Sequence, residues 1–311
     1  MNPEPFESGS VVLWPDSNSF SDFADSFLQI PTLPPHSDTK FVDSDRVSSS
    51  TTFSPNTNWH SDLALVSADS VIFYVASRTL LDASDNAFRH LIPTTPSDDT
   101  NLVIHVPESS TTLDIMLHTV YNKSFSQYRS FEDLSNAVDQ LPVYGVPSKA
   151  YIYEDTHLYK MLLSFAPIFP LKVYILAAKH DLEDLAVSTS SHLLSFDLST
   201  LSDETAEAIG SEYLRRLFFL HIGRLDALKR LLLWPPNSHS PTASCDAALT
   251  RAWALASAYL AWDSRPDLST NLLESTFVAL YKDLSCNICK ENLNTRINDL
   301  STHWSLVKRT I

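Results

Sequence analysis

Residues 62–75 read DLALVSADSVIFYV, and this stretch decides the fold class. Two runs of aliphatic and aromatic residues, 63–66 and 71–75, lie on either side of the polar residues 67–70. Short runs of this composition, separated by residues that favour turns, are typical of two strands joined by a tight connection. The stretch therefore predicts a pair of neighbouring β-strands at the start of the folded part of the chain.

A third strand and several helices are predicted after this pair. Residues 78–91 carry apolar side chains at a spacing that suits one or two short helices, and residues 102–106 form a further apolar run that Pro107 ends. The predicted helices beyond Pro107 cover residues 109–121, 131–145, 171–194, 202–210, 211–234, 250–262 and 276–283. The expected fold class is α+β, a small sheet with helical hairpins followed by an all-helical C-terminal region.

The long helix predicted from Ser211 carries two crowded apolar clusters, residues 217–220 and 231–234. Together they cover almost the whole circumference of the helix. A helix that is apolar on all sides is typically buried. We therefore expect this helix to be buried, and to join the C-terminal half of the chain to the first half or to a second copy of itself.

Residues 1–58 have the composition of a disordered tail. They are rich in Ser, Asp, Thr, Asn and Pro, and eight acidic residues against two basic ones give a net charge of -6. Such a segment buries too little apolar surface to offset the entropy lost on ordering. Within it, Phe20, Phe23, Phe27 and Leu28 stand at helical spacing among acids. This motif either folds against a partner's groove or is an inert tail with scattered aromatics.

The composition argues against several classes of partner. A net charge of -15 disfavours binding to nucleic acid or to an anionic membrane. There are four glycines, too few and too dispersed for a phosphate-binding loop. No signal peptide is visible at the start, and the apolar stretch 252–262 is too short to span a bilayer. We expect an intracellular protein, in the cytoplasm or the nucleus.

The three cysteines, Cys245, Cys286 and Cys289, all lie in the last quarter of the chain. The CxxC spacing of the last two suits the binding of one Zn²⁺, and Cys245 with His239 or His303 would complete four ligands. The sequence therefore suggests a structural zinc site at Cys245, Cys286, Cys289 and His239. The alternatives are cysteines packed as small apolar residues and a thioredoxin-like redox motif.

No catalytic constellation stands out, so we do not expect an enzyme. No serine lies in a Gly-x-Ser-x-Gly turn. Residues 180–184 place three acids beside a histidine, which on an amphipathic helix indicates a solvated face. His157, His192 and His221 lie among apolar neighbours, where histidines usually make structural hydrogen bonds.

The order of the predicted elements resembles a known domain. Asp62 opens the first strand, residues 80–84 and 86–88 follow the second, and residues 106–109 lead from the third strand into a helix. Strand, strand, two short helices, strand and paired helices is the order of the BTB/POZ domain, which this part of the chain resembles.

The chain is similar in particular to BTB/POZ proteins of mushroom-forming fungi. Further matching stretches are Tyr144-Gly145-Val146-Pro147, residues 177–182 and residues 249–267. The resemblance covers roughly residues 58–311 and implies a BTB/POZ-like domain at 59–170 and a helical extension at 171–311, after the acidic Ser/Pro-rich tail that composition indicates at 1–58.

The resemblance implies a scaffold that binds other proteins and forms homodimers. Asp62 matches the acid of the charged pocket that many of these domains present, and Leu80, Leu81 and Phe88 would lie nearest the dimer interface. The alternative is that these three apolar residues belong to the core of a monomer.

Two parts of the sequence lack motifs on which well-known functions of the family depend. Ala76 and Ser77 stand where the charged pocket has a histidine and a basic residue, and residues 91–100 lack the glutamate of a hydrophobic-x-Glu motif that ligase adaptors carry. Two other functions remain as alternatives, a transcription-associated regulator that uses the acidic-aromatic tail and a substrate adaptor of a ubiquitin ligase.

Overall fold

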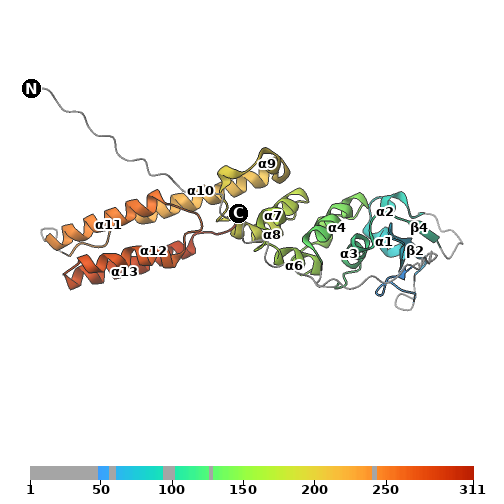
Figure 1. Ribbon diagram of the computed structural model, residues 1–311, viewed down its shortest axis with the longest axis horizontal. Coiled ribbons are helices and arrows are strands. Elements are labelled where there is room, and N and C mark those ends of the chain that lie inside the picture. The colour runs from blue at the N-terminus through green and yellow to red at the C-terminus, as the bar shows by residue number, and fades with distance from the viewer. Residues whose placement is uncertain (1–47, 56–60, 94–101, 126–128, 240–243) are drawn as a thin grey trace, which may run out of the picture. The chain divides into compact units, whose positions relative to one another are not determined.

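The computed structural model describes residues 48–55, 61–93, 102–125, 129–239 and 244–311. These residues form an α+β fold in which a small mixed sheet is followed by a mostly helical region (Figure 1). The predicted fold class is confirmed. The tail motif of Phe20, Phe23, Phe27 and Leu28 lies outside the described residues. Within the described ranges, no helix combines the length and the apolar composition that a bilayer crossing requires.

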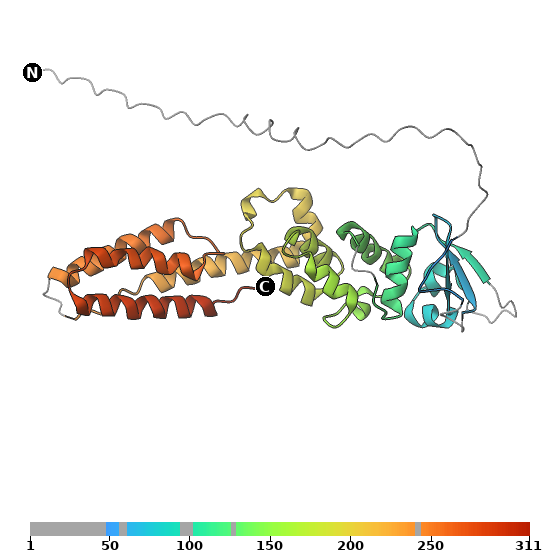
Figure 2. The same cartoon turned by 60° about the horizontal axis from the view of Figure 1, so that its bottom comes forward.

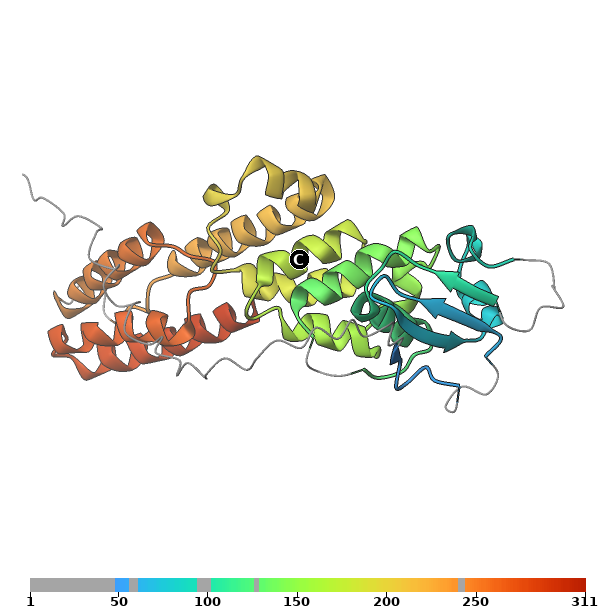
Figure 3. The ribbon, with the colours of Figure 1, turned by 45° about the vertical axis from the view of Figure 1, so that its right-hand side comes forward.

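The sheet has four strands in the order β1-β3-β2-β4. The hairpin predicted from residues 62–75 consists of β2 (Leu63–Val66) and β3 (Val71–Val75), which pair antiparallel. The predicted third strand is β4 (Leu102–His105), which pairs parallel to β2. Figure 3 shows these three strands side by side. All three strand predictions are therefore confirmed to within one residue.

The first strand was not expected from the sequence. β1 (Ser48–Ser49) pairs parallel to β3, and the N–H of Tyr74 donates to the carbonyl of Phe53 over 2.8 Å. Phe53 is fully buried, with its ring 5.0 Å from that of His118. Residues 48–55, assigned to the tail, are thus part of the folded unit. Their Ser/Thr-rich composition does not indicate a strand, because it is the pairing with β3 that orders this segment.

The helices around the first core are mostly short. They are α1 (Ser77–Ala83), α2 (Ala87–His90), α3 (Ser110–Val120), α4 (Phe131–Val143), α5 (Ser148–Tyr151), α6 (His157–Ser164), α7 (Pro170–Lys179), α8 (Glu183–Ser190) and α9 (Asp203–Ile209). Side-chain caps explain several starts, because Ser109, Ser130 and Ser202 each accept a hydrogen bond from the first turn of the next helix.

One predicted helix is broken in the structure. Residues 171–194 form α7 and α8, separated by Asp181, whose φ of 51° lies in the left-handed region. Asp181 pairs with Lys149 and accepts a hydrogen bond from the hydroxyl of Tyr213 at 2.6 Å. These contacts from distant segments favour the break, which a local periodicity does not reveal.

Four helices build a second core. α10 (Ser211–Leu232), α11 (Ser244–Trp262), α12 (Thr270–Val278) and α13 (Asn287–Leu306) pack against one another, as Figure 2 shows in yellow to red. The long helix from Ser211 and the helix at 250–262 were predicted, whereas α13 was not. The apolar stripe that buries α13 consists of Cys289, Leu293, Ile297, Leu300 and Trp304.

The two cores share α10. Tyr213 and Leu217 from its first half belong to the core that begins at Phe53, while Leu228 and Leu232 from its second half belong to the core of α11–α13. The boundary between the two cores of the described residues therefore lies within a single helix. The domain bounds drawn at residue 170 stay a prediction.

α10 is not buried on all sides, contrary to the prediction. Phe219 and Ile222 are 66% and 56% exposed, because the two cores cover only one face of the helix and leave the opposite face to solvent. The apolar residues of α10 are thus divided between a buried stripe and an exposed one.

Arg224 lies on α10 between the two cores and is 1% exposed. Its guanidinium donates to the carbonyls of Pro266, Val307 and Lys308 over 2.6, 2.8 and 3.0 Å, and it lies 4.3 Å from the centre of the Trp304 ring. Burial lowers the pKa of Arg224 to about 10, so the group stays charged at neutral pH. One cation therefore satisfies three carbonyls at the junction of the cores.

Replacing Arg224 by Met should lower the free energy of unfolding by about 3 kcal/mol or more, since three carbonyls lose their donor while the aliphatic stem is retained. Arg230→Met is the matched control, because Arg230 is exposed and makes only an i,i+4 ion pair with Asp226. Urea unfolding of the full chain measures both. Equal losses in the two variants would contradict the role of Arg224.

Gly145→Ala should destabilise the fold by about 2 kcal/mol or more. Gly145 has φ +72°, and an added Cβ would lie 2.5 Å from Oδ1 of Asn86. Gly223→Ala is the control, since this glycine lies in α10 with no atom within 4 Å of the added methyl. It should instead stabilise by about 0.5–1 kcal/mol. Thermal unfolding that ranks the two variants in the opposite order would refute this account.

Candidate functional site

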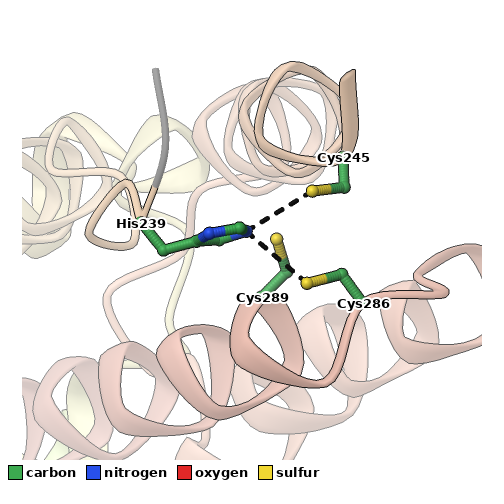
Figure 4. A group of neighbouring side chains, drawn as sticks. All are labelled: His239, Cys245, Cys286 and Cys289. Carbon is green, nitrogen blue, oxygen red and sulfur yellow. Dashed lines mark hydrogen bonds between the residues drawn. The ribbon is translucent and has the colours of Figure 1, made fainter. Parts of the chain in front are cut away.

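The four residues suggested as zinc ligands come together in space. His239, Cys245, Cys286 and Cys289 place their ligand atoms within 4.8 Å of one another. Figure 4 shows the imidazole of His239 directed at the three sulfurs, with Nε2 3.4 Å from Sγ of Cys245 and 3.5 Å from Sγ of Cys286. The alternative histidine, His303, lies elsewhere on α13, where its Nδ1 is 2.7 Å from the carbonyl oxygen of Asp299.

Three elements supply these side chains. His239 ends the described segment that follows α10, and Cys245 lies in the first turn of α11. Cys286 is the N-cap residue of α13, and Cys289 lies in its first turn, buried in the second core. The CxxC spacing places both of its sulfurs at one helix start, because residues three apart lie on the same face of a helix.

Asp246 fixes the segment that carries His239. Its buried carboxylate accepts a hydrogen bond from the Ser238 hydroxyl at 2.5 Å and one from the His239 backbone N–H at 3.3 Å. Because Asp246 is adjacent to Cys245, one turn of α11 holds a cluster residue and also positions the histidine.

Side chains of α13 hold the same segment from the other side. Nδ2 of Asn292 donates to the carbonyl of Asn237 at 2.8 Å. Arg296 donates to the carbonyls of Leu231 and Trp234 over 2.6 and 2.9 Å. The path from α10 to His239 is thus fixed by polar contacts before any ligand is considered. No local pattern in the sequence indicates these contacts, because each joins residues far apart in the chain.

The thiols of the CxxC motif differ in acidity. A hydrogen bond from the Cys289 backbone N–H lowers the pKa of Cys286 to about 7, whereas burial raises the pKa of Cys289 to about 12. All three cysteines are free thiols in the structure. The group therefore offers three sulfur donors and one imidazole nitrogen, the donor set that Zn²⁺ prefers in structural sites.

The residues expected at a dimer interface have other roles. Leu80 and Phe88 are 0% and 1% exposed and belong to the first core, and Leu81 is half-buried against it. Leu80 and Phe88 therefore pack as core residues, in line with the alternative that the sequence left open, because the chain's own sheet and helices cover them.

Asp62 caps a helix. Its carboxylate accepts hydrogen bonds from the N–H and the hydroxyl of Ser77 over 2.7 and 2.5 Å. Because Ala76, the N-cap residue of α1, has no side-chain oxygen, Asp62 replaces the missing cap from its position just before β2. Asp69 in the hairpin turn binds Ser110 at the start of α3 in the same way.

The histidines show structural partners. A ring nitrogen of His157 lies 3.1 Å from the carbonyl oxygen of Phe125, and one of His221 lies 3.1 Å from that of Leu193. The structural interpretation is confirmed for these two residues. His180 is 2.5 Å from the carboxylate of Asp139, while the three acids Asp181, Glu183 and Asp184 are exposed, as expected for a solvated face.

The chain matches no protein-family model, and no curated protein or solved structure matches it either. Its function is therefore inferred from its own residues.

Asp62→Ala should lower the free energy of unfolding by about 1 kcal/mol at neutral pH, the usual value of a helix cap. Burial acts to raise the pKa of Asp62, but the hydrogen bonds from Ser77 outweigh it and leave the pKa below its ordinary value. This contribution is present above the unfolded pKa of about 3.9 and is lost as the pH falls through the folded pKa.

Denaturant unfolding at several pH values measures the difference between the wild type and Asp62→Ala. The difference should shrink below about pH 4. Asp82→Ala is the control, since Asp82 is exposed and pairs only with Arg78. A difference that is absent at pH 7, or that grows toward acid pH, would contradict a capping role.

Proposed function

We propose that the chain is a protein–protein interaction scaffold with a BTB/POZ-like domain at about 59–170 and a helical extension at 171–311, and that it forms a homodimer. The element order supports this proposal. A β2–β3 hairpin, the short helices α1 and α2, the parallel strand β4 and the pair α3 and α4 follow one another as in the domain that the sequence resembles.

The observation that carries the proposal is an exposed apolar face on α11. Leu255, Tyr259 and Trp262 are 74%, 61% and 92% exposed. Their spacing of four and three residues places them on one side of the helix. Aromatic side chains that protrude in this way are enriched at the centres of protein interfaces. An apolar stripe of this kind indicates a surface that another protein covers.

A second copy of the chain fits this face better than a charged partner. All of α11 is described, and Arg251 is its one exposed charged residue, while Ala247, Ala254 and Ala258 are exposed beside the larger side chains. Two copies that each carry a net charge of -15 repel one another where acids are dense. Two copies of the chain can therefore approach each other at a face that has no exposed acidic residues.

Two-fold symmetry suits such a face, because it places one patch against the same patch of the partner. Alanines allow two helices to come close, and the three large side chains can pack between them. These three side chains would bury about 500 Å² per copy, below the roughly 800 Å² of a standard interface. The expected dimer is therefore reversible, with a dissociation constant in the micromolar range.

The double variant Leu255→Ser/Tyr259→Ser should shift the full chain from dimer to monomer at concentrations well above the expected dissociation constant, because it removes the centre of the apolar stripe. Light scattering after size exclusion measures the mass. Ile168→Ser is the control, since Ile168 is 65% exposed but lies outside α11. A monomeric wild type, or an equal shift in Ile168→Ser, would refute a dimer at this face.

A further inference from the structure

We propose that His239, Cys245, Cys286 and Cys289 bind one Zn²⁺ as a structural, tetrahedral site that joins the segment after α10 to the starts of α11 and α13. This site is independent of the proposed scaffold function. It would give the second core a metal cross-link at the end where these three segments meet (Figure 4).

The distances suit a zinc ion. Zn–S and Zn–N bonds of about 2.3 and 2.0 Å in a tetrahedron place a nitrogen about 3.5 Å from each sulfur and the sulfurs about 3.8 Å apart. The Nε2 atom of His239 is 3.4 and 3.5 Å from the sulfurs of Cys245 and Cys286, and no pair of ligand atoms exceeds 4.8 Å. Small rotations of the side chains are enough to form the full coordination shell.

Hydrogen bonds hold this cluster only weakly. A thiol is a weak donor and a weak acceptor, so contacts among the three thiols and the imidazole contribute little to keeping the four groups together. A divalent cation interacts with all four groups at once and displaces the thiol protons, including the one on buried Cys289. The arrangement supplies the four ligand atoms that a structural zinc ion needs.

The donor types favour zinc over other common cations. Mg²⁺ and Ca²⁺ prefer oxygen ligands, whereas thiolates with imidazole select Zn²⁺. Four protein ligands leave no open position for water or substrate, which marks a structural site and not a catalytic one. Three thiolates leave a net charge of about -1 on the loaded site, and the N-terminus of the 20-residue α13 is favourable for it.

The surroundings hold the ligands in place. Asp246 orients the backbone at His239, and Asn292 and Arg296 hold the carbonyls of the preceding segment. Residues that orient metal ligands in this way typically raise the affinity of a metal site. His239 and Cys286 are 47 residues apart in sequence, so the metal would close a long loop and thereby restrict the unfolded chain.

Metal analysis of the full chain, purified under reducing conditions without chelators, tests the proposal. We expect about one zinc per chain. Replacement of zinc by Co²⁺ should give the visible absorption and the thiolate charge-transfer bands of tetrahedral Co²⁺. A chain that contains no zinc and takes up no Co²⁺ after reduction overturns the proposal, as does a Cys286–Cys289 disulfide in the freshly purified protein.

Variants identify the ligands. His239→Ala and Cys286→Ser should each lower the zinc content roughly tenfold or more. His303→Ala is the matched control, because His303 is also on α13 but lies outside the cluster, and it should keep the wild-type content. Equal zinc contents in His239→Ala and His303→Ala would refute the ligand set.

A variant that keeps all four ligands tests the site even if the loss of a ligand prevents folding. Asp246→Ala keeps all four ligands but removes the acceptor for Ser238 and His239, and should weaken zinc affinity by about 10- to 100-fold in competition with a chromophoric chelator. The chelator should also lower the Tm of the wild type. An unchanged affinity in Asp246→Ala together with an unchanged Tm would count against the site.

Discussion

The hydrogen bonds of the buried Arg224 guanidinium tie the segments before α12 and after α13 to α10, the helix that the two cores share. Each accepting carbonyl, of Pro266, Val307 and Lys308, lies outside a helix and therefore lacks a helical donor. A neutral side chain could not serve all three, and a charge without them could not be buried. The ring of Trp304 covers the cation from one side. The entry to α12 and the exit of α13 are thereby both tied to the middle of α10. These contacts hold the ends of two helices of the second core in place.

Local signals in the sequence predicted the fold where local chemistry decides it. The hairpin, the capped starts of α3, α4 and α9, and the long helix ending before Pro235 all follow from patterns within a few residues. The prediction failed where distant contacts decide. β1 exists because β3 offers an edge, and the break at Asp181 exists because Lys149 and Tyr213 lie beside it. A pattern of neighbouring residues in the sequence cannot reveal either of these long-range contacts.

The candidate site was predictable in type but not in assembly. A CxxC motif and a third cysteine in the same quarter of the chain indicate a metal, since that spacing places two sulfurs on one side of a helix start. The choice between His239 and His303 depends on the path of the chain after α10, which Asn292 and Arg296 determine from α13. Asp62 shows a different limit of sequence reasoning. The sequence singled out this residue as a functional position, but it did not indicate that Asp62 accepts a hydrogen bond from Ser77 of the same chain.

The sharing of α10 between two cores bears on how this chain can change in evolution. Domains are usually exchanged or inserted at exposed, flexible linkers that few contacts cross. Here the boundary between the cores falls inside a continuous helix, between Leu217 and Leu228. An insertion of even one residue there would rotate everything beyond it by about 100° around the helix axis. Insertions and deletions between Leu217 and Leu228 are therefore disfavoured, and the two cores are inherited as one unit.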